Sequence, residues 1–551
     1  MTDPLDTDNK PCSVKARQGF SVYYRNRYLY SQYDAEKPVT RLIDSLTILP
    51  ETLILAYSPA LGTGLIRLLE RLPENCRVLA VEFDRELYDF FLNTDNAKAA
   101  LSDPRFSAVF LERPEQITGL AVQDKLRRCL TVEMSGGTAF FQEAYRLTTK
   151  YADDAIATFW KNHITLTRMG RLYARNLFSN TAHLSDNPLS LQKCIKPHSV
   201  SKPLLALGAG PSLDELLPLL PAARKNFFIL AADAALPALF QYGLRPDAVV
   251  AVESQIAIEK AYIGFEGSQI PLIADMTSRP RVLSIMKGQV SFFMTEYCNE
   301  PFIARFRKLA EGNGIPVFPP LGSVGLYALE LALYLRSGNT PVFFSGLDFA
   351  WGKGSTHCKG APAHTAALLN TTRLNPVGNP AAAFGNGTIA FKGKNGATGY
   401  TTPNLSGYGR LLGERYRNTP LLFDAGSSGM QTGIECISIE NMLLNAQKRA
   451  NNTTSAQTDD ISLWMADAPV SAPVFLAEEY ESVKEICALI DDYLAATQAA
   501  ESGKRLLEML EEHSYLYLHF PDAARGPVLS RDFLARVQLE ASRLLTHLAG
   551  C

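Results

Sequence analysis

A glycine turn between an apolar strand and a helix is the feature that most limits how this chain can fold. In the segment LLALGAGPSLDELL (204–217), an apolar run leads into Gly208 and Gly210, and leucines at helical spacing follow. The alternation of strand and helix repeats as far as the strand PVFFSGLD (341–348). Such alternation folds into parallel βαβ units, so we expect an α/β protein with a central, doubly wound sheet that binds its ligand at the carboxyl ends of its strands.

Other patterns divide the rest of the chain into segments. Tyrosines alternate around Arg25 and Asn26 as in a β-hairpin, and the stretch 351–413 is rich in Gly, Asn, Thr and Pro, as in a long functional loop. We expect an N-terminal hairpin cap with a small Rossmann-like α/β domain (1–140), a helical connector (141–200), the central α/β domain (201–440), a polar linker (441–470) and a C-terminal domain of three helices (471–551).

Charge and cysteine content argue against several classes of protein. The 551 residues carry 54 Lys and Arg against 56 Asp and Glu, and this formal net charge of −2 argues against a nucleic-acid-binding protein. The sequence shows neither a long apolar run typical of a membrane span nor a secretory leader. Its nine cysteines include no CxxC pair, which argues against a zinc site. We therefore expect a cytoplasmic protein without a metal centre built from cysteines.

The glycine turn is the first candidate binding site. Without side chains at Gly208 and Gly210, backbone N–H groups can approach a ligand, and Pro211 stiffens the turn. Ser212, with Glu215 three residues later, has the pattern of a capping box, which would place the positive end of a helix over the turn. A phosphate suits such a site. A tight turn whose glycines serve only packing would use the same residues.

Two further strand ends and one helix start can border the same cleft. Asp233 ends the next strand, where doubly wound folds place a group that contacts a ribose, although it can equally cap the following helix. Glu253 ends a later strand and can face the cleft. Gly322 and Ser323 precede the apolar helix VGLYALELALYL, of which Ser323 is the expected N-cap.

The segment SGLDFAWGKGSTHCKG (345–360) supplies candidates for catalysis. Asp348 ends a buried strand, and His357 follows in a glycine-rich loop. Because histidine titrates near neutral pH, His357 can take a proton from an acceptor hydroxyl; a surface-loop histidine is the alternative. Further along, Tyr408 and Arg410 can contact an acidic sugar, since a guanidinium binds a carboxylate in bidentate geometry, or they can lie on the solvated face of a helix.

Three segments of the central region resemble the motility accessory factors. They are GAGPSLDELLPLL, ILAADAALPALFQYGLRPDAVVAVESQ and GSVGLYALELALYLRSGNTPVFFSGLDFAWGKGSTHCKG. These factors are flagellin glycosyltransferases that share a central domain with 6-hydroxymethylpterin diphosphokinase, and the GxGPSL turn is also similar to that of bacterial sialyltransferases. The resemblance covers about 202–433 well and 53–111 more loosely. It implies a sialyltransferase-like (GT-A-like) central domain.

The resemblance implies a CMP-linked nonulosonic acid as donor and Ser or Thr hydroxyls of flagellin as acceptors, in an inverting transfer. It places His357 and Asp348 in catalysis and the glycine turn at the donor phosphate. Asp233, Glu253 and the helix start at Ser323 would complete the donor site, although the family usually has aspartate near the Glu253 position. No cofactor is firmly implied, Mg²⁺ is possible, and the amphipathic C-terminal helices permit a homo-oligomer.

Two other functions stay open at this point. A 6-hydroxymethylpterin diphosphokinase-like enzyme would hold Mg²⁺ with Asp214, Asp233 or Asp348, but no Walker lysine follows the glycine turn, and the chain is long for a pterin substrate. A non-catalytic, flagellin-binding chaperone would need no active site. The intact Gly208 and Ser212 argue against full degeneration of the nucleotide site.

Overall fold

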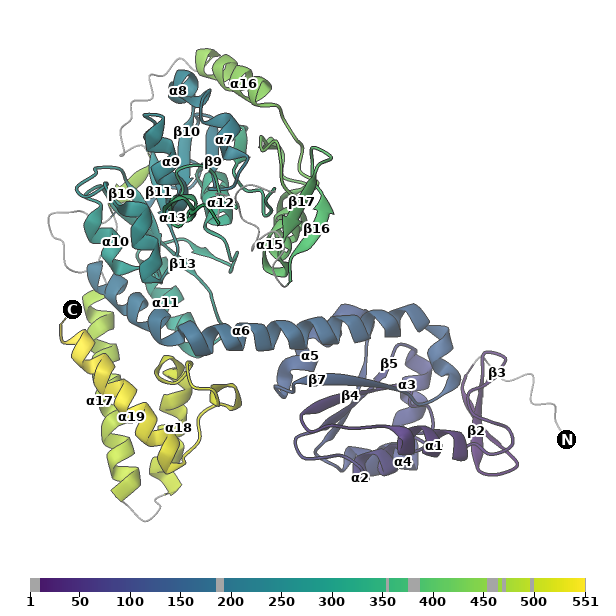
Figure 1. Cartoon of the computed structure of the whole chain (residues 1–551). Coiled ribbons are helices and arrows are strands. Elements are labelled where there is room, and N and C mark those ends of the chain that lie inside the picture. Colours follow the sequence, from purple (N-terminus) through teal and green to yellow (C-terminus); the bar gives the residue numbers. More distant parts are fainter. Residues whose placement is uncertain are drawn as a thin grey trace. The chain divides into compact units, whose positions relative to one another are not determined.

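The computed structural model describes residues 10–184, 193–352, 356–374, 387–452, 464–467, 472–495 and 500–550. The chain forms two compact units, Met1–Arg168 with Pro521–Arg525 and Met169–Phe520 with Gly526–Cys551. The long helix α6 (Gln142–His183) covers most of the segment expected as a helical connector and contributes residues to both units (Figure 1).

The first unit contains a parallel sheet with helices and a small antiparallel sheet. The parallel strand order is β6 (Phe106–Phe110), β5 (Arg77–Glu82), β4 (Thr52–Tyr57), β7 (Arg128–Glu133). The helices that accompany it are α1 (Lys37–Ser45), α2 (Leu65–Glu70), α3 (Arg85–Leu92), α4 (Asp95–Leu101) and α5 (Ile117–Gln123). Apolar side chains from both faces of the sheet form the core of this unit.

The predicted N-terminal hairpin is present. The antiparallel strands are β1 (Cys12–Lys15), β2 (Phe20–Tyr24) and β3 (Arg27–Tyr28). Arg25 and Asn26 form the turn with positive φ values of 45° and 60°, which suits the twist of a two-residue hairpin. Tyr23 pairs with Tyr28 across the hairpin, with ring centroids 5.0 Å apart.

The second unit is built on an eight-stranded parallel sheet, which confirms the predicted doubly wound α/β fold. The strand order is β14 (Val317–Phe318), β13 (Val290–Thr295), β12 (Leu272–Asp275), β11 (Ala248–Ala251), β10 (Phe228–Ala232), β9 (Leu204–Leu207), β15 (Val342–Ser345), β18 (Leu422–Asp424). From β9 the chain proceeds to β14 at one edge and then returns to β15 on the other side of β9. Ligands of doubly wound folds bind where the strand order reverses in this way.

Helices cover the sheet because its strands are apolar on both faces. The helices between β9 and residue 452 are α7 (Leu213–Leu216), α8 (Leu220–Ala223), α9 (Leu236–Gln241), α10 (Pro280–Ile285), α11 (Pro301–Gly312), α12 (Val324–Leu335), α13 (Pro362–Leu369), α15 (Pro403–Tyr416) and α16 (Ile439–Asn452). Helix α12 is apolar around most of its circumference and packs against β9, β10, β11 and β15. The start of α12 is thereby held at the carboxyl ends of the central strands.

Two segments expected to be irregular contain regular structure. The stretch 351–413, expected as a loop, holds α13, the hairpin of β16 (Ile389–Lys392) and β17 (Thr398–Thr401), and most of α15; 353–355 and 375–386 lie outside the described residues. In the expected linker 441–470, α16 continues to Asn452 and β19 (Met465–Asp467) pairs with β8 (Lys193–Ile195). Residues 453–463 and 468–470 of that linker are not among those described.

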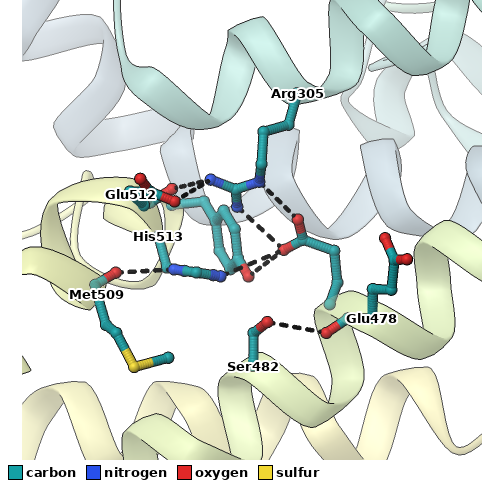
Figure 2. A network of polar contacts seen from close by, with 8 residues as sticks. Arg305, Glu478, Ser482, Met509, Glu512 and His513 are labelled. Carbon is teal, nitrogen blue, oxygen red and sulfur yellow. Dashed lines mark hydrogen bonds and ion pairs between the residues drawn. The ribbon is translucent and has the colours of Figure 1, made fainter.

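The C-terminal segment forms the three helices that its spacing predicts, α17 (Ala472–Ala495), α18 (Ala500–Glu512) and α19 (Arg531–Leu548). A buried carboxylate, Glu479 on α17, pairs with Arg305 on α11, which is labelled in Figure 2. Arg305 on α11 donates to both carboxylate oxygens of Glu479, at 2.9 and 3.2 Å, and to the carbonyl of Glu512 at 2.6 Å. The Tyr515 hydroxyl donates to Glu479 Oε2 at 2.7 Å.

Candidate functional site

A cavity of about 340 Å³ lies at the carboxyl ends of β9, β10 and β15, where the strand order reverses. Five of the residues selected from the sequence line it: Gly208, Gly210, Ser323, Asp348 and His357. Its volume lies within the range of small-molecule sites, about 300–1,000 Å³. The fold therefore assembles, at the position expected for a ligand, residues that come from three distant parts of the chain.

The two glycines of the turn allow a neighbouring loop to approach. Gly208 N donates to the carbonyl of Ser345 at 2.9 Å, and Gly210 N donates to the carbonyl of Gly346 at 2.8 Å. A Cβ atom on Gly208 would collide with the Gly346 carbonyl, and one on Gly210 would collide with the Asp348 carboxylate. Because both amides bond within the protein, close packing is the role that the structure gives to these glycines.

Ser212 does not cap a helix, so the predicted capping box with Glu215 is wrong. Its backbone is helical, with φ −64° and ψ −18°, and its side chain accepts no capping hydrogen bond from α7. Instead, Ser212 Oγ donates to Asp348 Oδ2 at 3.0 Å and accepts from Gly346 N at 3.1 Å, while Ser212 N donates to the same carboxylate oxygen at 3.0 Å. The amide of Ser212 was expected to stay free for a ligand. It is instead bonded to the carboxylate of Asp348, which lies in a distant loop.

Asp348 is 3% exposed and accepts hydrogen bonds at both carboxylate oxygens. Its second oxygen, Oδ1, accepts from Ser428 Oγ at 3.1 Å. Burial raises the pKa of Asp348 to about 6, although the bonds from Ser212 and the charge of Lys394 oppose this rise. Asp348 thus joins the turn after β9 to the loops after β15 and β18.

Lys394 is a buried cation that was not among the site residues expected from the sequence. It lies between β16 and β17, and its Nζ is 2.6 Å from Asp424 Oδ2, with the two side chains 9% and 1% exposed. Burial raises the pKa of Asp424 while Lys394 lowers it. The run KGKNG (392–396) contains only the turn signal Asn-Gly; nothing in its spacing indicates a carboxylate at the end of a distant strand.

The N-terminus of α12 opens onto the cavity. Ser323 occupies the expected N-cap position in an extended conformation, but its side chain makes no capping hydrogen bond. Ser323, Val324 and Gly325 all line the cavity, and the first turn of α12 contains no acidic residue. In α7, by contrast, Asp214 and Glu215 occupy the first turn. The helix end best suited to an anion in this cavity is therefore that of α12.

His357 lies in the wall of the same cavity. Its Nδ1 is 3.0 Å from Thr356 Oγ1, and burial lowers the pKa of the imidazole below its usual value of 6.5. A lowered pKa keeps the ring neutral at physiological pH, the form that accepts a proton. His357 thus has the protonation state of a general base.

Asp233 and Glu253 occupy different environments. Asp233 is buried at the end of β10, and its Oδ1 accepts from Ala234 N at 2.8 Å, as a cap of the following turn would. Its Oδ2 is buried without a hydrogen-bond partner among the described residues, and burial raises the pKa of this carboxyl to about 7. Glu253 is exposed after β11, bonds to Gln255 N at 3.0 Å, and does not line the cavity.

Tyr408 and Arg410 lie on different sides of α15. The ring of Tyr408 is half-buried against Gly322, which has a φ of +75° and no space for a side chain, and lies 6.4 Å from the ring of Phe349 in the cavity wall. Arg410 is exposed and does not line the cavity. The structure therefore places Tyr408 beside the candidate site and Arg410 away from it.

A smaller cavity of about 80 Å³ adjoins the first beside the β16–β17 hairpin. Pro211 lines the smaller cavity, whereas Trp351 lines both. The indole Nε1 of Trp351 is buried and has no acceptor among the described residues. This N–H therefore lacks the hydrogen bond that a buried donor usually makes. Nothing in the sequence indicates Trp351 as a site residue, since a tryptophan beside glycines gives no indication of its burial.

The residues considered for Mg²⁺ do not form a common site. Within the described ranges, no group of three or more His, Cys, Asp or Glu side chains is placed to hold a metal ion. Asp214 instead accepts from Lys359 N at 2.8 Å, and Asp348 is held by Ser212. The same ranges include no helix that is both long enough and apolar enough to cross a membrane.

Comparisons with known proteins agree with this architecture. An uncharacterised protein of Treponema pallidum (strain Nichols) is 32% identical over 554 residues, which cover 98% of this chain and 95% of that protein. Residues 174–354 match the 6-hydroxymethylpterin diphosphokinase MptE-like family. The solved structure of the MAf glycosyltransferase of Magnetospirillum magneticum AMB-1 covers 99% of this chain and 87% of its own, with a TM-score of 0.56 and 16% identity. The MptE-like match includes Asp348 and ends before His357 and Lys394.

Proposed function

Because this chain belongs to one family with the Treponema pallidum protein and has the fold of a MAf glycosyltransferase, we propose that it transfers a sugar from a nucleotide-activated donor to a hydroxyl group. One observation carries the proposal. The cavity at the strand reversal combines a helix N-terminus whose first turn contains no acidic residue, at Ser323, with a neutral histidine, His357. The first group suits the departing phosphate of a donor and the second suits the proton of an acceptor.

The donor that fits this reading is a CMP-linked nonulosonic acid. Its single phosphate would accept from the amides at the start of α12, whose first turn contains no carboxylate. The indole N–H of Trp351 would donate to a polar atom of the sugar, since it otherwise has no acceptor among the described residues. We take Ser or Thr hydroxyls of flagellin as the acceptors, and the cytoplasm as the place where they are modified.

The chemical step is a single displacement. The acceptor oxygen attacks C2 of the sugar as the bond from C2 to the phosphate oxygen breaks, and the electron pair of that bond leaves with CMP. The acceptor proton passes to His357, whose ring is oriented by the 3.0 Å contact between Nδ1 and Thr356 Oγ1. The end of α12 stabilises the charge that develops on the phosphate. Configuration at C2 is inverted.

The donor site is tested by calorimetric titration with CMP. Ser323→Asp places a carboxylate where the phosphate would bind, so we expect CMP affinity to fall at least about tenfold. Ser438→Asp is the matched control, because Ser438 precedes α16, accepts from Asn441 N at 3.2 Å and lies outside the cavity. Equal CMP affinity in native protein and Ser323→Asp would show that the phosphate does not bind at the start of α12.

Catalysis is tested with His357→Gln in a transfer assay that follows the mass of flagellin. We expect CMP binding to persist and transfer to fall about 10²- to 10⁴-fold, the usual contribution of a general base. In the native protein, activity should persist below pH 6.5 before it falls, because the pKa of His357 is lowered. Full transfer activity in His357→Gln would assign the base to another group.

A diphosphokinase is the second candidate, because residues 174–354 match the MptE-like family. This enzyme would bind ATP with Mg²⁺ and transfer a diphosphate to a pterin alcohol. The same calorimeter distinguishes the two, since Mg²⁺-dependent ATP binding without a CMP response favours the diphosphokinase. No response to either nucleotide would favour a flagellin-binding chaperone.

A further inference from the structure

A second and larger cavity, of about 580 Å³, lies among helices of the second unit. It is formed by the C-terminal half of α6, the short helix η7 (Ser514–Leu516) with the residues that follow it, and α19. It shares no lining residue with the cavity at the strand reversal. Its volume is within the range of small-molecule sites, about 300–1,000 Å³.

Positive charge dominates the lining of this cavity. Arg171 and Arg175 come from α6 and Arg543 from α19, whereas Glu540 is the acidic member of the described lining. Arg171 and Arg543 each donate to Glu540 Oε1 at 2.6 Å. Arg175 makes no ion pair with any described residue. Two guanidinium groups therefore share one carboxylate, and the third, that of Arg175, has no carboxylate partner among the described residues.

The histidine beside this cluster also has an unused donor. Arg171 Nη2 lies 3.1 Å from His519 Nε2, and because a guanidinium only donates, Nε2 is the acceptor and the proton of the neutral ring is on Nδ1. That Nδ1 is buried and has no acceptor among the described residues. Burial and the charge of Arg171 lower the pKa of His519 to about 4, which keeps the ring neutral.

We propose that this cavity binds a small organic phosphate. Guanidinium groups bind phosphate oxygens in bidentate geometry, and the unpaired Arg175 supplies a first contact without the loss of an existing ion pair. The remaining wall is largely apolar, with Ala174, Leu516 and Leu544, which suits the organic part of such a ligand. Inorganic phosphate alone would leave this apolar surface uncovered.

The test is calorimetric titration with phenyl phosphate and with inorganic phosphate, at constant ionic strength. We expect phenyl phosphate to bind saturably and more tightly than inorganic phosphate. Arg175→Ala should weaken phenyl phosphate binding about tenfold, as expected when one hydrogen-bonded charge is lost. Arg505→Ala is the matched control, because Arg505 on α18 is also exposed and charged but lies outside the cavity.

Three results would overturn the proposal. They are no saturable binding of phenyl phosphate, the same affinity for inorganic phosphate as for phenyl phosphate, or a loss of phenyl phosphate affinity in Arg505→Ala as large as that in Arg175→Ala. A loss in Ser323→Asp but not in Arg175→Ala would assign the binding to the cavity at the strand reversal. Glu540→Gln supplies a second measurement, because it frees Arg171 and Arg543. We expect phenyl phosphate to raise the melting temperature of Glu540→Gln more than that of the native protein.

Discussion

The carboxylate of Asp348 binds together segments that are far apart in the chain. It accepts from Ser212, 136 positions earlier, and from Ser428, 80 positions later. Since Gly208 and Gly346 touch backbone to backbone beside it, this carboxylate fixes the floor of the cavity while it remains almost inaccessible to water. Its burial has a cost, because ionisation is unfavourable in such surroundings.

We expect this cost to appear as a pH dependence of stability. The pKa of Asp348 is raised from 3.8 to about 6 in the folded protein, so the folded state retains a proton that the unfolded chain has lost between these values. Stability contributed by this group therefore falls as pH rises from about 4 to about 6. Asp348→Asn removes the titration. We therefore expect the free energy of unfolding of the variant, relative to that of the native protein, to rise by up to about 3 kcal/mol between pH 4 and pH 7.

Urea unfolding at each pH measures this difference. Both proteins keep Asp424 and Lys394, so the contribution of that buried pair largely cancels in the comparison. A stability difference that stays constant across the range would mean that the folded protein holds Asp348 ionised even at pH 4.

The sequence predicted which residues meet in the cavity better than it predicted what each residue does. Gly208, Ser323, Asp348 and His357 were found because strand ends and helix starts of a doubly wound sheet converge at one edge. The capping box at Ser212 was wrong because local spacing cannot show that a distant carboxylate competes for the same amide. For Arg410 the sequence left a sugar contact and a solvated helix face open, because residue type does not fix which face of α15 a side chain occupies; Arg410 is exposed.

The regular elements were predictable where they are long and apolar. Strands β9 and β10 and helix α12 follow from continuous apolar runs. The β16–β17 hairpin was missed because its strands are four residues long and neither shows a regular alternation of buried and exposed residues. The Asn395-Gly396 pair, with Gly396 at a φ of +76°, is a hairpin signal that the glycine-rich composition of the stretch concealed.

Helix α17 is held to α11 by an ion pair whose carboxylate is buried, and the loss of this pair should destabilise the second unit. Arg305→Ala leaves Glu479, which is 4% exposed, without its cation. We expect a loss of about 3 kcal/mol in the free energy of unfolding, as for other buried pairs that lose one partner. Chemical denaturation measures it.

Lys484→Ala is the control on the same helix. Lys484 pairs with Glu481 at 3.3 Å, and both side chains are more than 60% exposed. Such a surface pair contributes about 0–1 kcal/mol, so this variant should unfold close to the native protein. Similar losses in both variants would show that the network in Figure 2 contributes no more than a surface pair.

The two units have separate hydrophobic cores, so we expect two transitions on heating. One core surrounds the strands β4 to β7 and the other surrounds the eight-stranded sheet. Ile54→Ala removes a fully buried side chain from the first core and should destabilise that unit by about 2–5 kcal/mol, lowering one melting temperature only. Differential scanning calorimetry separates the two transitions.

A ligand supplies the complementary control. CMP bound to the cavity at the strand reversal should raise only the transition that Ile54→Ala leaves unchanged, because binding stabilises the unit that contains the site. A single transition that both perturbations shift would show that the units unfold together.

The strand order of the large sheet also has a consequence for the newly made chain. Ser212 emerges from the ribosome 136 residues before Asp348, and at about 5–20 residues per second the delay is on the order of 10 s. During that time one edge of β9 has no partner, because β15 has not yet been made. The nascent protein therefore passes through a period in which an apolar strand edge is open to other chains and the cavity at the strand reversal has not yet formed.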